Sequence, residues 1–322
     1  MRLTARRTGL ATSAAVLGMV LAGCGDEAGT GGDLPTVAAS FYPLAFVAEW
    51  VGGGDVRVVN LTPPGVESHD LELTPRQVGE IAEADLVVYE KGFQPSVDEA
   101  VDQNAGDARV EVTEVVPLED LEDHGEHDDA TEDEHADEHE GDDHAHGDLT
   151  GDPHVWLDPT LLATIAGAVA DGLAEVVPES ADAFQERADA LVVELVALDE
   201  EFSTGLAQCE RSVFVTTHEA FGYLAHRYGL EMVGISALSP DAEPSPARLA
   251  EVREVIADEG VTTVFYETLV SPKVAETLAD DLGVVTAVLD PIEGLTDETE
   301  DEDYFTLMRA NLGALEEANG CT

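Results

Sequence analysis

Three histidines lie in three separate local motifs, each at a point where an apolar run gives way to a turn or to the start of a helix. They are His69 in ESHDLELTP, His154 in DPHVWLDP and His218 in VFVTTHEAFGYLA. Neutral imidazole is the commonest side-chain ligand for zinc. A zinc finger would hold its ligands in one short stretch, whereas ligands this far apart meet only if a fold brings them together. The pattern therefore predicts a metal site assembled by tertiary structure.

A carboxylate is expected to complete this site. Zn²⁺ favours four ligands drawn from nitrogen, sulfur and a single carboxylate oxygen, whereas Mn²⁺ and Ca²⁺ take more carboxylate oxygen. In open α/β sheets, ligands bind beyond the carboxyl ends of the strands. The fourth ligand should therefore follow the last strand-like run, VVTAVLD, in the segment 290–294. Three imidazoles and one carboxylate favour zinc.

The elements that must position these residues alternate between strand-like and helical patterns in both halves of the chain. Several helices should open with a capping residue followed by proline: Thr74-Pro75, Asp158-Pro159, Ser245-Pro246 and Ser271-Pro272. The strand-like runs are 36–41, 56–62, 85–90, 212–217, 230–236, 261–267 and 284–290. The alternation predicts an α/β fold with two (βα)-type lobes, mostly parallel sheets and the metal site in the cleft between the lobes.

One long helix should join the two lobes. The segment 179–208 has no glycine or proline before Gly205, and its apolar residues recur at spacings of three and four, as an amphipathic helix requires. We expect a helix of roughly 28 residues there, between an N-terminal lobe at 36–178 and a C-terminal lobe at 209–322. A continuous helix would permit only modest motion between the lobes.

The first 23 residues have the pattern of a lipoprotein signal peptide. Arg2, Arg6 and Arg7 precede a short apolar core that ends in Leu-Ala-Gly-Cys24, which resembles the bacterial lipobox. Lipidation of Cys24, followed by a flexible tether at 24–35, would hold the protein on the outer face of the cytoplasmic membrane. An ordinary secretory signal is the alternative. Once Cys24 is assigned to lipid, Cys209 and Cys321 remain as a pair in an oxidising compartment, where a disulfide is expected.

Charge is distributed very unevenly along the chain. The formal net charge of −55 comes from 69 acidic and 14 basic side chains, which argues against nucleic-acid binding. It suits a protein that handles cations, and equally a lineage-wide adaptation to salt. Segment 119–148 holds sixteen acidic residues, no basic ones and six histidines: His124, His127, His135, His139, His144 and His146. We expect a disordered loop that captures metal weakly; a solvated acidic insertion is the alternative.

These motifs together resemble the zinc-binding lipoproteins of ABC-type metal importers. The resemblance rests on ESHDLELTP, DPHVWLDP, the H-AFGYLA-YGL pattern, the acidic histidine loop and LDPIEGLT, in this order over nearly all of the mature chain. It implies two lobes joined by a rigid helix, with His69, His154 and His218 as ligands. It also implies Glu293, water or Asp290 in the fourth position, with Glu293 favoured. Related manganese binders usually carry Glu where this chain has His218 and end their ligand set with Asp.

The function implied is capture of extracellular Zn²⁺ by a monomer that delivers it to a membrane permease and catalyses nothing. A manganese-binding importer subunit and a surface adhesin or metal buffer are the alternatives within the same fold. A secreted zinc hydrolase is a further one, but the sequence has no HExxH motif, because Gly222 stands where the second histidine would be. Asp158 is interpreted as a helix cap and His226 as a surface histidine.

Overall fold

The computed structural model describes residues 34–121, 151–240 and 242–322, all within one compact unit, Leu34–Thr322. Cys24 and the six histidines of segment 119–148 lie outside the described residues. The predicted α/β class is confirmed. The described residues form two four-stranded sheets in which every strand pair is parallel.

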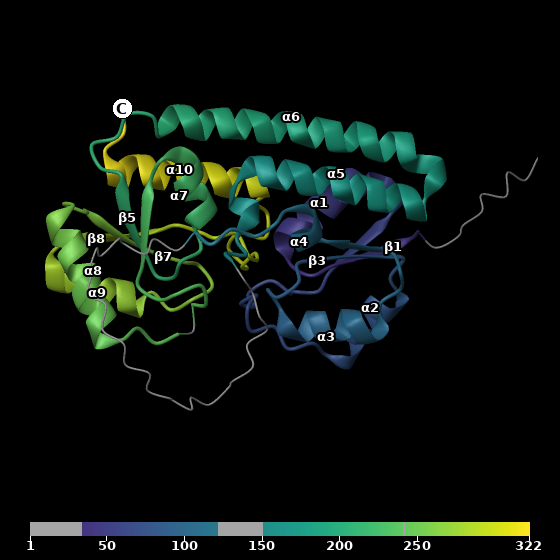
Figure 1. Cartoon of the computed structure of the whole chain (residues 1–322), viewed down its shortest axis with the longest axis horizontal. Coiled ribbons are helices and arrows are strands. Elements are labelled where there is room, and N and C mark those ends of the chain that lie inside the picture. The colour runs from purple at the N-terminus through teal and green to yellow at the C-terminus, as the bar shows by residue number, and fades with distance from the viewer. Residues whose placement is uncertain (1–33, 122–150, 241) are drawn as a thin grey trace, which may run out of the picture. The chain divides into compact units, whose positions relative to one another are not determined.

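The first sheet has the strand order β2-β1-β3-β4 and is covered by helices on both faces (Figure 1). Helices α1 and α5 pack on one face, and α2 and α3 pack on the other. Buried apolar side chains alternate between these two layers along β1 and β3, which is the pattern of a strand covered on both faces. The elements are β1 (Thr36–Ala39), α1 (Tyr42–Gly52), β2 (Arg57–Asn60), α2 (Pro75–Glu83), β3 (Leu86–Tyr89), α3 (Pro95–Asn104), β4 (Arg109–Glu111), α4 (Val112–Val115) and α5 (Pro159–Val176).

The second sheet repeats this plan with the order β6-β5-β7-β8. Helices α8 and α9 share a small core with one face of the sheet, whereas α7 and α10 pack into the larger core of the molecule. The elements are β5 (Val213–Thr216), α7 (Gly222–Tyr228), β6 (Glu231–Gly234), α8 (Pro246–Asp258), β7 (Thr263–Tyr266), α9 (Lys273–Leu282), β8 (Val285–Val288) and α10 (Tyr304–Asn319).

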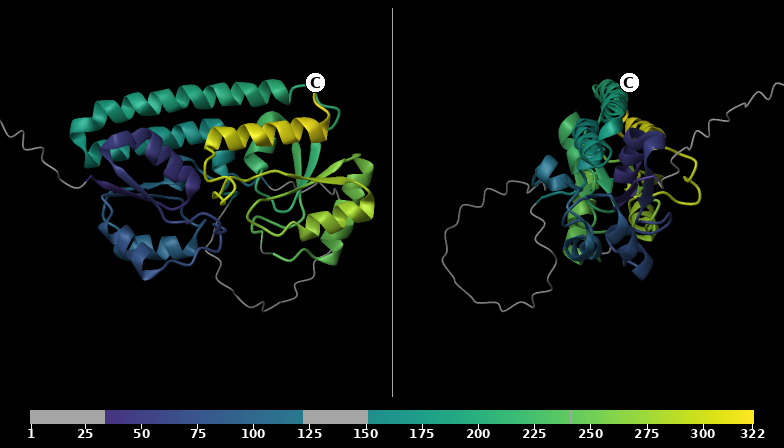
Figure 2. Two further views of the ribbon diagram at one scale, coloured as in Figure 1. Left: turned by 180° about the vertical axis from the view of Figure 1, so that it is seen from behind. Right: turned by 90° about the vertical axis from the view of Figure 1, so that its right-hand side faces the viewer.

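The linking helix is α6 (Ala181–Gly205), which has 25 residues and begins after a short 3-10 turn at Pro178–Ser180. It runs beside α5 and reaches α10 (Figures 1 and 2). Its buried side chains belong to one apolar core that continues into both lobes. Cys209, just after α6, forms a disulfide with Cys321, just after α10, across a separation of 112 residues. The disulfide therefore fixes the C-terminal end of α10 to the segment between α6 and β5.

Three of the four predicted helix caps form. Thr74 closes a capping box with Gln77, and Asp158 and Ser245 accept hydrogen bonds from backbone N–H groups in the first turns of α5 and α8. The prediction for Ser271-Pro272 was wrong by one position, because α9 begins at Lys273 and Pro272 itself occupies the cap position without a side-chain hydrogen bond.

Candidate metal centre

Four side chains from distant parts of the sequence converge at the carboxyl ends of the two sheets. His69 follows β2, His218 follows β5 and Glu293 follows β8, whereas His154 lies just before α5. One potential ligand atom from each of the four side chains lies within 4.8 Å of the other three. His154 and His218 are fully buried, Glu293 is 2% exposed and His69 is 12% exposed. His69 is therefore the most exposed of the four side chains, although its Nε2 atom is buried.

The distances within this group match the size of a zinc ion. Glu293 Oε1 lies 3.5 Å from the Nε2 atom of each of the three histidines. A regular tetrahedron has edges about 1.6 times its centre-to-vertex distance, so these three edges have the length expected for a central ion about 2.1 Å from each ligand atom. Zinc takes this distance to imidazole nitrogen and to carboxylate oxygen. The remaining edges, between the nitrogens, are within 4.8 Å.

The same four atoms are buried without any hydrogen-bond partner. They are His69 Nε2, His154 Nε2, His218 Nε2 and Glu293 Oε1. A buried polar atom without a partner costs about 1–3 kcal/mol, more if it is charged. Four such atoms pointing at one another need a common partner, and a divalent cation provides one.

Two carboxylates hold two of the imidazole rings from behind. His154 Nδ1 lies 2.7 Å from Asp152 Oδ1, which also accepts the His154 backbone N–H, and His218 Nδ1 lies 2.6 Å from Glu267 Oε1. A carboxylate at Nδ1 favours the tautomer that carries its proton there and leaves the Nε2 lone pair free for a metal. Thr217 also donates a hydrogen bond to Glu267. His69 instead packs edge-on against Phe93, 4.6 Å between ring centroids.

The carboxylates of the site raise the pKa of two of its histidines and so favour their protonated forms. Burial would lower the pKa of His218, but Glu267 and Glu293 outweigh burial and raise it to about 10. Burial would likewise lower the pKa of His154, but Asp152 and Glu293 outweigh burial and raise it. Burial would raise the pKa of Glu293, yet the surrounding imidazoles, His69 foremost, hold it well below its usual range. A metal that binds here must therefore displace a proton.

Asp290, the alternative carboxylate, is occupied elsewhere. Its Oδ1 accepts the backbone N–H of Ile292, and its Oδ2 accepts the hydroxyl of Thr268, each at 2.7 Å. Asp290 therefore shapes the turn that carries Glu293. Ile292, in this turn, has φ 59°, and it is the one non-glycine residue with positive φ among those that the structure describes. Such a conformation is unusual for a β-branched residue and persists only where the surroundings enforce it.

Sequence reasoning missed Asp152 and Glu267. Asp152 had a local signal, because it lies two residues before His154 in the same motif. Glu267 had only a partial signal, because it is the last residue of the strand-like run 261–267. Nothing local shows that β7 neighbours β5, which ends before His218. The strand order of the second sheet decides that contact.

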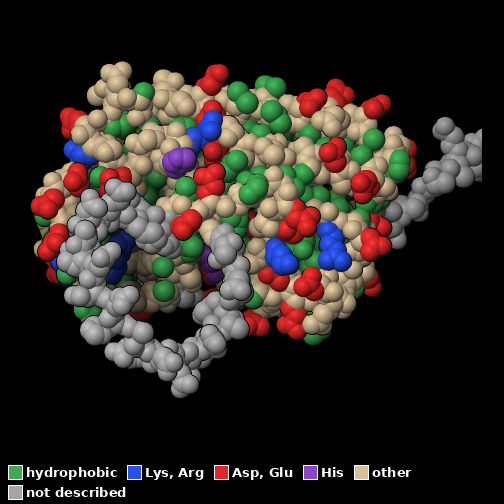
Figure 3. All heavy atoms as spheres, in the orientation of Figure 1, with side chains coloured by type: hydrophobic (Ala, Val, Ile, Leu, Met, Phe, Trp, Pro, Cys, Tyr) green, Lys and Arg blue, Asp and Glu red, His purple; other side chains and the backbone are tan. Residues whose placement is uncertain are grey.

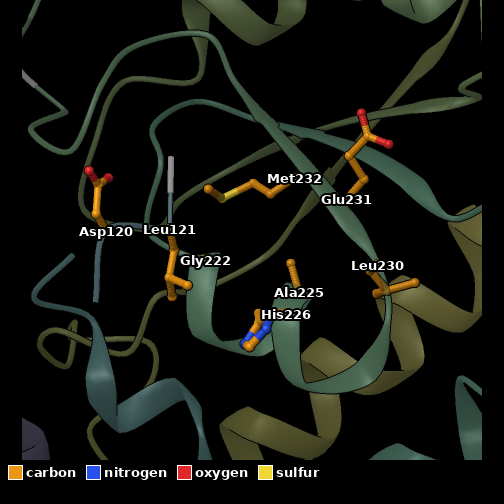
Figure 4. Close-up of a pocket in the computed structure, with 8 residues that line it drawn as sticks. All are labelled: Asp120, Leu121, Gly222, Ala225, His226, Leu230, Glu231 and Met232. Carbon is orange, nitrogen blue, oxygen red and sulfur yellow. The ribbon is translucent and has the colours of Figure 1, made fainter. Parts of the chain in front are cut away.

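His226 lies outside the metal centre, as expected for a surface histidine. It is exposed on α7 and lines a pocket of about 320 Å³ together with Asp120, Leu121 and residues of β6 (Figure 4). Asp158 caps α5 through the backbone N–H of Thr160 at 2.7 Å.

Two parallel α/β sheets that bring three imidazoles and one carboxylate together define a protein with a candidate site for a divalent metal ion. The chain belongs to the family zinc-uptake complex component A, periplasmic, whose model matches residues 37–318. It is 34% identical to the zinc-binding lipoprotein AdcA of Streptococcus pneumoniae serotype 4, over 94% of this chain but only 59% of AdcA. It is 33% identical to the high-affinity zinc uptake system protein ZnuA of Bacillus subtilis, over 93% of this chain and 94% of ZnuA.

Solved structures agree with this assignment. The Zn(II)-bound ZnuA-like domain of Streptococcus pneumoniae AdcA superposes with a TM-score of 0.70 at 32% identity, over 89% of this chain and 99% of that domain. The laminin-binding protein Lmb of Streptococcus agalactiae, described as a bifunctional protein with adhesin and metal transporting activity, gives 0.74 at 28% identity, over 88% of this chain and 99% of Lmb. The named relatives are zinc-binding, zinc-uptake or adhesin proteins, in agreement with the expectation that the chain is not an enzyme.

Proposed function

We propose that this chain is the zinc-binding component of an ABC-type importer, which captures Zn²⁺ outside the cell and hands it to a membrane permease. His69, His154, His218 and Glu293 are the proposed ligands. The observation that carries the proposal is the set of four buried, unpartnered ligand atoms, with the Glu293 oxygen 3.5 Å from each of the three nitrogens. A set with one carboxylate favours zinc over manganese.

The remaining parts of the chain fit this role. Lipidation of Cys24 would keep the protein beside its permease, and the relative AdcA of Streptococcus pneumoniae is named a lipoprotein. The histidines of segment 119–148 would capture zinc weakly before it reaches the main site. Acidic side chains are spread widely over the face of the molecule that Figure 3 shows. Because 69 acidic side chains outnumber 14 basic ones in the sequence, the local concentration of cations near the protein is raised.

Replacement of the ligands one at a time tests the site. Each of His69→Ala, His154→Ala and His218→Ala should weaken zinc binding by more than about 100-fold, because even residues behind a ligand contribute 10–100-fold. Competition with a chromogenic zinc chelator measures the loss, and His226→Ala is the matched control because His226 is exposed and lies outside the site. Near-native affinity in all three ligand variants would remove the basis of the assignment.

Transport is tested separately in cells. Deletion of the gene should impair growth on zinc-poor medium, and added zinc should restore it. An adhesin is the second candidate, because of the similarity to Lmb. An adhesin without transport activity would leave growth on zinc-poor medium unchanged and would bind laminin equally well with and without His218→Ala.

A further inference from the structure

The turn Asp290–Glu293 is connected to the surroundings of all three histidines. Ser68, the neighbour of His69, donates its hydroxyl to the Glu293 carbonyl at 3.0 Å. Trp156, two residues after His154, donates its indole N–H to the Pro291 carbonyl at 2.7 Å. Thr268 donates its hydroxyl to Asp290 Oδ2 at 2.7 Å.

The Thr268 contact leads to the third histidine. Thr268 directly follows Glu267, and Glu267 is the carboxylate that holds His218. Each of the three ligand segments therefore reaches the same four-residue turn through a hydrogen bond made by a neighbouring residue. The Ser68–Glu293 and Trp156–Pro291 hydrogen bonds each join segments more than one hundred residues apart in the sequence. The turn therefore sets how the ligands lie relative to one another.

This turn is itself anchored by Asn311 of α10. The Asn311 side-chain amide donates to the Asp290 carbonyl at 2.6 Å, and its oxygen accepts the Asp290 backbone N–H at 2.8 Å. Asn311 is 2% exposed, so water does not replace these bonds. The paired bonds fix the Asp290 peptide groups on both sides of its Cα atom, just before the strained residue Ile292.

Helix α10 is held firmly enough to serve as an anchor. The disulfide fixes its C-terminal end, and at its N-terminal end the Tyr304 hydroxyl donates to the Trp156 carbonyl at 2.6 Å. Tyr304 is fully buried. The helix therefore touches the His154 segment at one end and the Glu293 turn in its middle.

We infer that Asn311 is a positioning residue of the metal centre, which holds the Asp290–Glu293 turn so that one Glu293 oxygen completes a four-coordinate site. The inference rests on the proposed zinc-binding function. A metal site must be held within about 0.5 Å of its productive geometry to keep its preference for one ion. Release of the turn would allow Glu293 to bind through both oxygens, which favours ions that accept more oxygen ligands. It would also allow Glu293 to withdraw, which removes one of the four zinc ligands.

The test compares two asparagines on the same helix. Asn311→Leu removes both bonds to Asp290. Asn319→Leu is the control, because Asn319 is also buried on α10, 1% exposed, but its side-chain nitrogen has no partner and it lies at the disulfide end. Both variants are purified as the full extracellular chain, and Zn²⁺ and Mn²⁺ affinities are measured by chelator competition. The visible spectrum of the Co²⁺-loaded protein reports coordination number.

Asn311→Leu should weaken zinc binding by about 10–100-fold, as loss of a residue behind a ligand does. It should also narrow the preference for Zn²⁺ over Mn²⁺ and reduce the intense visible bands of four-coordinate Co²⁺. Asn319→Leu should leave all three unchanged. If Asn311→Leu fails to fold, Asn311→Asp keeps an acceptor for the Asp290 N–H but loses the donor, and it should show the same changes to a smaller extent.

Two failures can be told apart. A wild-type protein that does not bind zinc tightly would refute the proposed function. Tight zinc binding by the wild type, with an unchanged Co²⁺ spectrum and affinities within twofold in the Asn311 variants, would refute the positioning role alone.

Discussion

Gly222 should contribute to tight metal binding although it is not one of the four candidate ligands. It is the first residue of α7, and a Cβ atom added there would lie less than 3.0 Å from Asp152 Oδ2 and 3.2 Å from the Leu121 Cβ. Asp152 is only 3% exposed and is bonded to both the backbone and the ring of His154. Ordinary contact distances would require Asp152 Oδ2 to move by roughly 1 Å, which disturbs the two hydrogen bonds that Oδ1 of the same carboxylate makes with His154.

The size of the effect follows from these contacts. Loss of a carboxylate behind a metal-binding histidine costs about 10–100-fold in affinity, which is about 1.4–2.7 kcal/mol. Stability of the metal-free protein should change less, because alanine is favoured over glycine in a helix by about 1 kcal/mol while overpacking costs about 1–3 kcal/mol. Gly222→Ala should therefore cost more free energy of zinc binding than free energy of unfolding of the metal-free protein.

The assay is chelator competition together with thermal unfolding of the metal-free protein. Gly167→Ala in α5 is the matched control, because a Cβ atom at Gly167 meets nothing within 4 Å; it should leave affinity unchanged and stability equal or higher. A double-mutant cycle with Asp152→Ala checks the route, since Gly222→Ala should cost little once Asp152 is gone. An affinity for Gly222→Ala within twofold of the control would refute the reasoning.

Other properties of the chain follow from the same contacts. Zinc affinity should rise about tenfold per pH unit for each proton displaced, from pH 6 up to about 10, because His218 holds its proton up to that pKa; a flat profile in chelator competition would contradict histidine ligation. Burial, and after it Asp152, raises the pKa of Glu90 well above its usual range. The wild type therefore loses stability as pH rises above 4.5, the pKa of this group in the unfolded chain. In denaturant titrations, Glu90→Gln should raise the free energy of unfolding at neutral pH, by about 1.4 kcal/mol for each unit between the folded and unfolded pKa values of Glu90, but should not change it at pH 4. Equal increases at both pH values would contradict this. Replacing Cys209 and Cys321 by serine should cost about 4–5 kcal/mol of unfolding free energy, and the parent chain lacking Cys24 should show no free thiol to a thiol-reactive dye under denaturing conditions. Deletion of residues 122–150 should lower zinc stoichiometry but leave the tight site intact, as metal analysis and competition would show; loss of tight binding would mean that this segment supplies a primary ligand.

The amino-acid sequence by itself determined the local features of this protein. The caps at Thr74, Asp158 and Ser245 formed as predicted because a cap depends only on a side chain and the next turn of its own helix. The parallel α/β class followed from the alternation of strand and helix patterns, which is also local. The histidine motifs were visible because each places its histidine at the end of a scaffold element, where a metal site on such a fold must lie.

Contacts across the sequence were decided only by the tertiary structure. Glu293 and Asp290 have the same chemistry and differ by three positions. Glu293 and not Asp290 lies beside the three histidines, and this placement depends on Thr268, Asn311 and the positive φ of Ile292. The support of His218 by Glu267 depends on β7 lying next to β5. No local pattern encodes these neighbours, because strand order and helix packing bring together residues that are far apart along the chain.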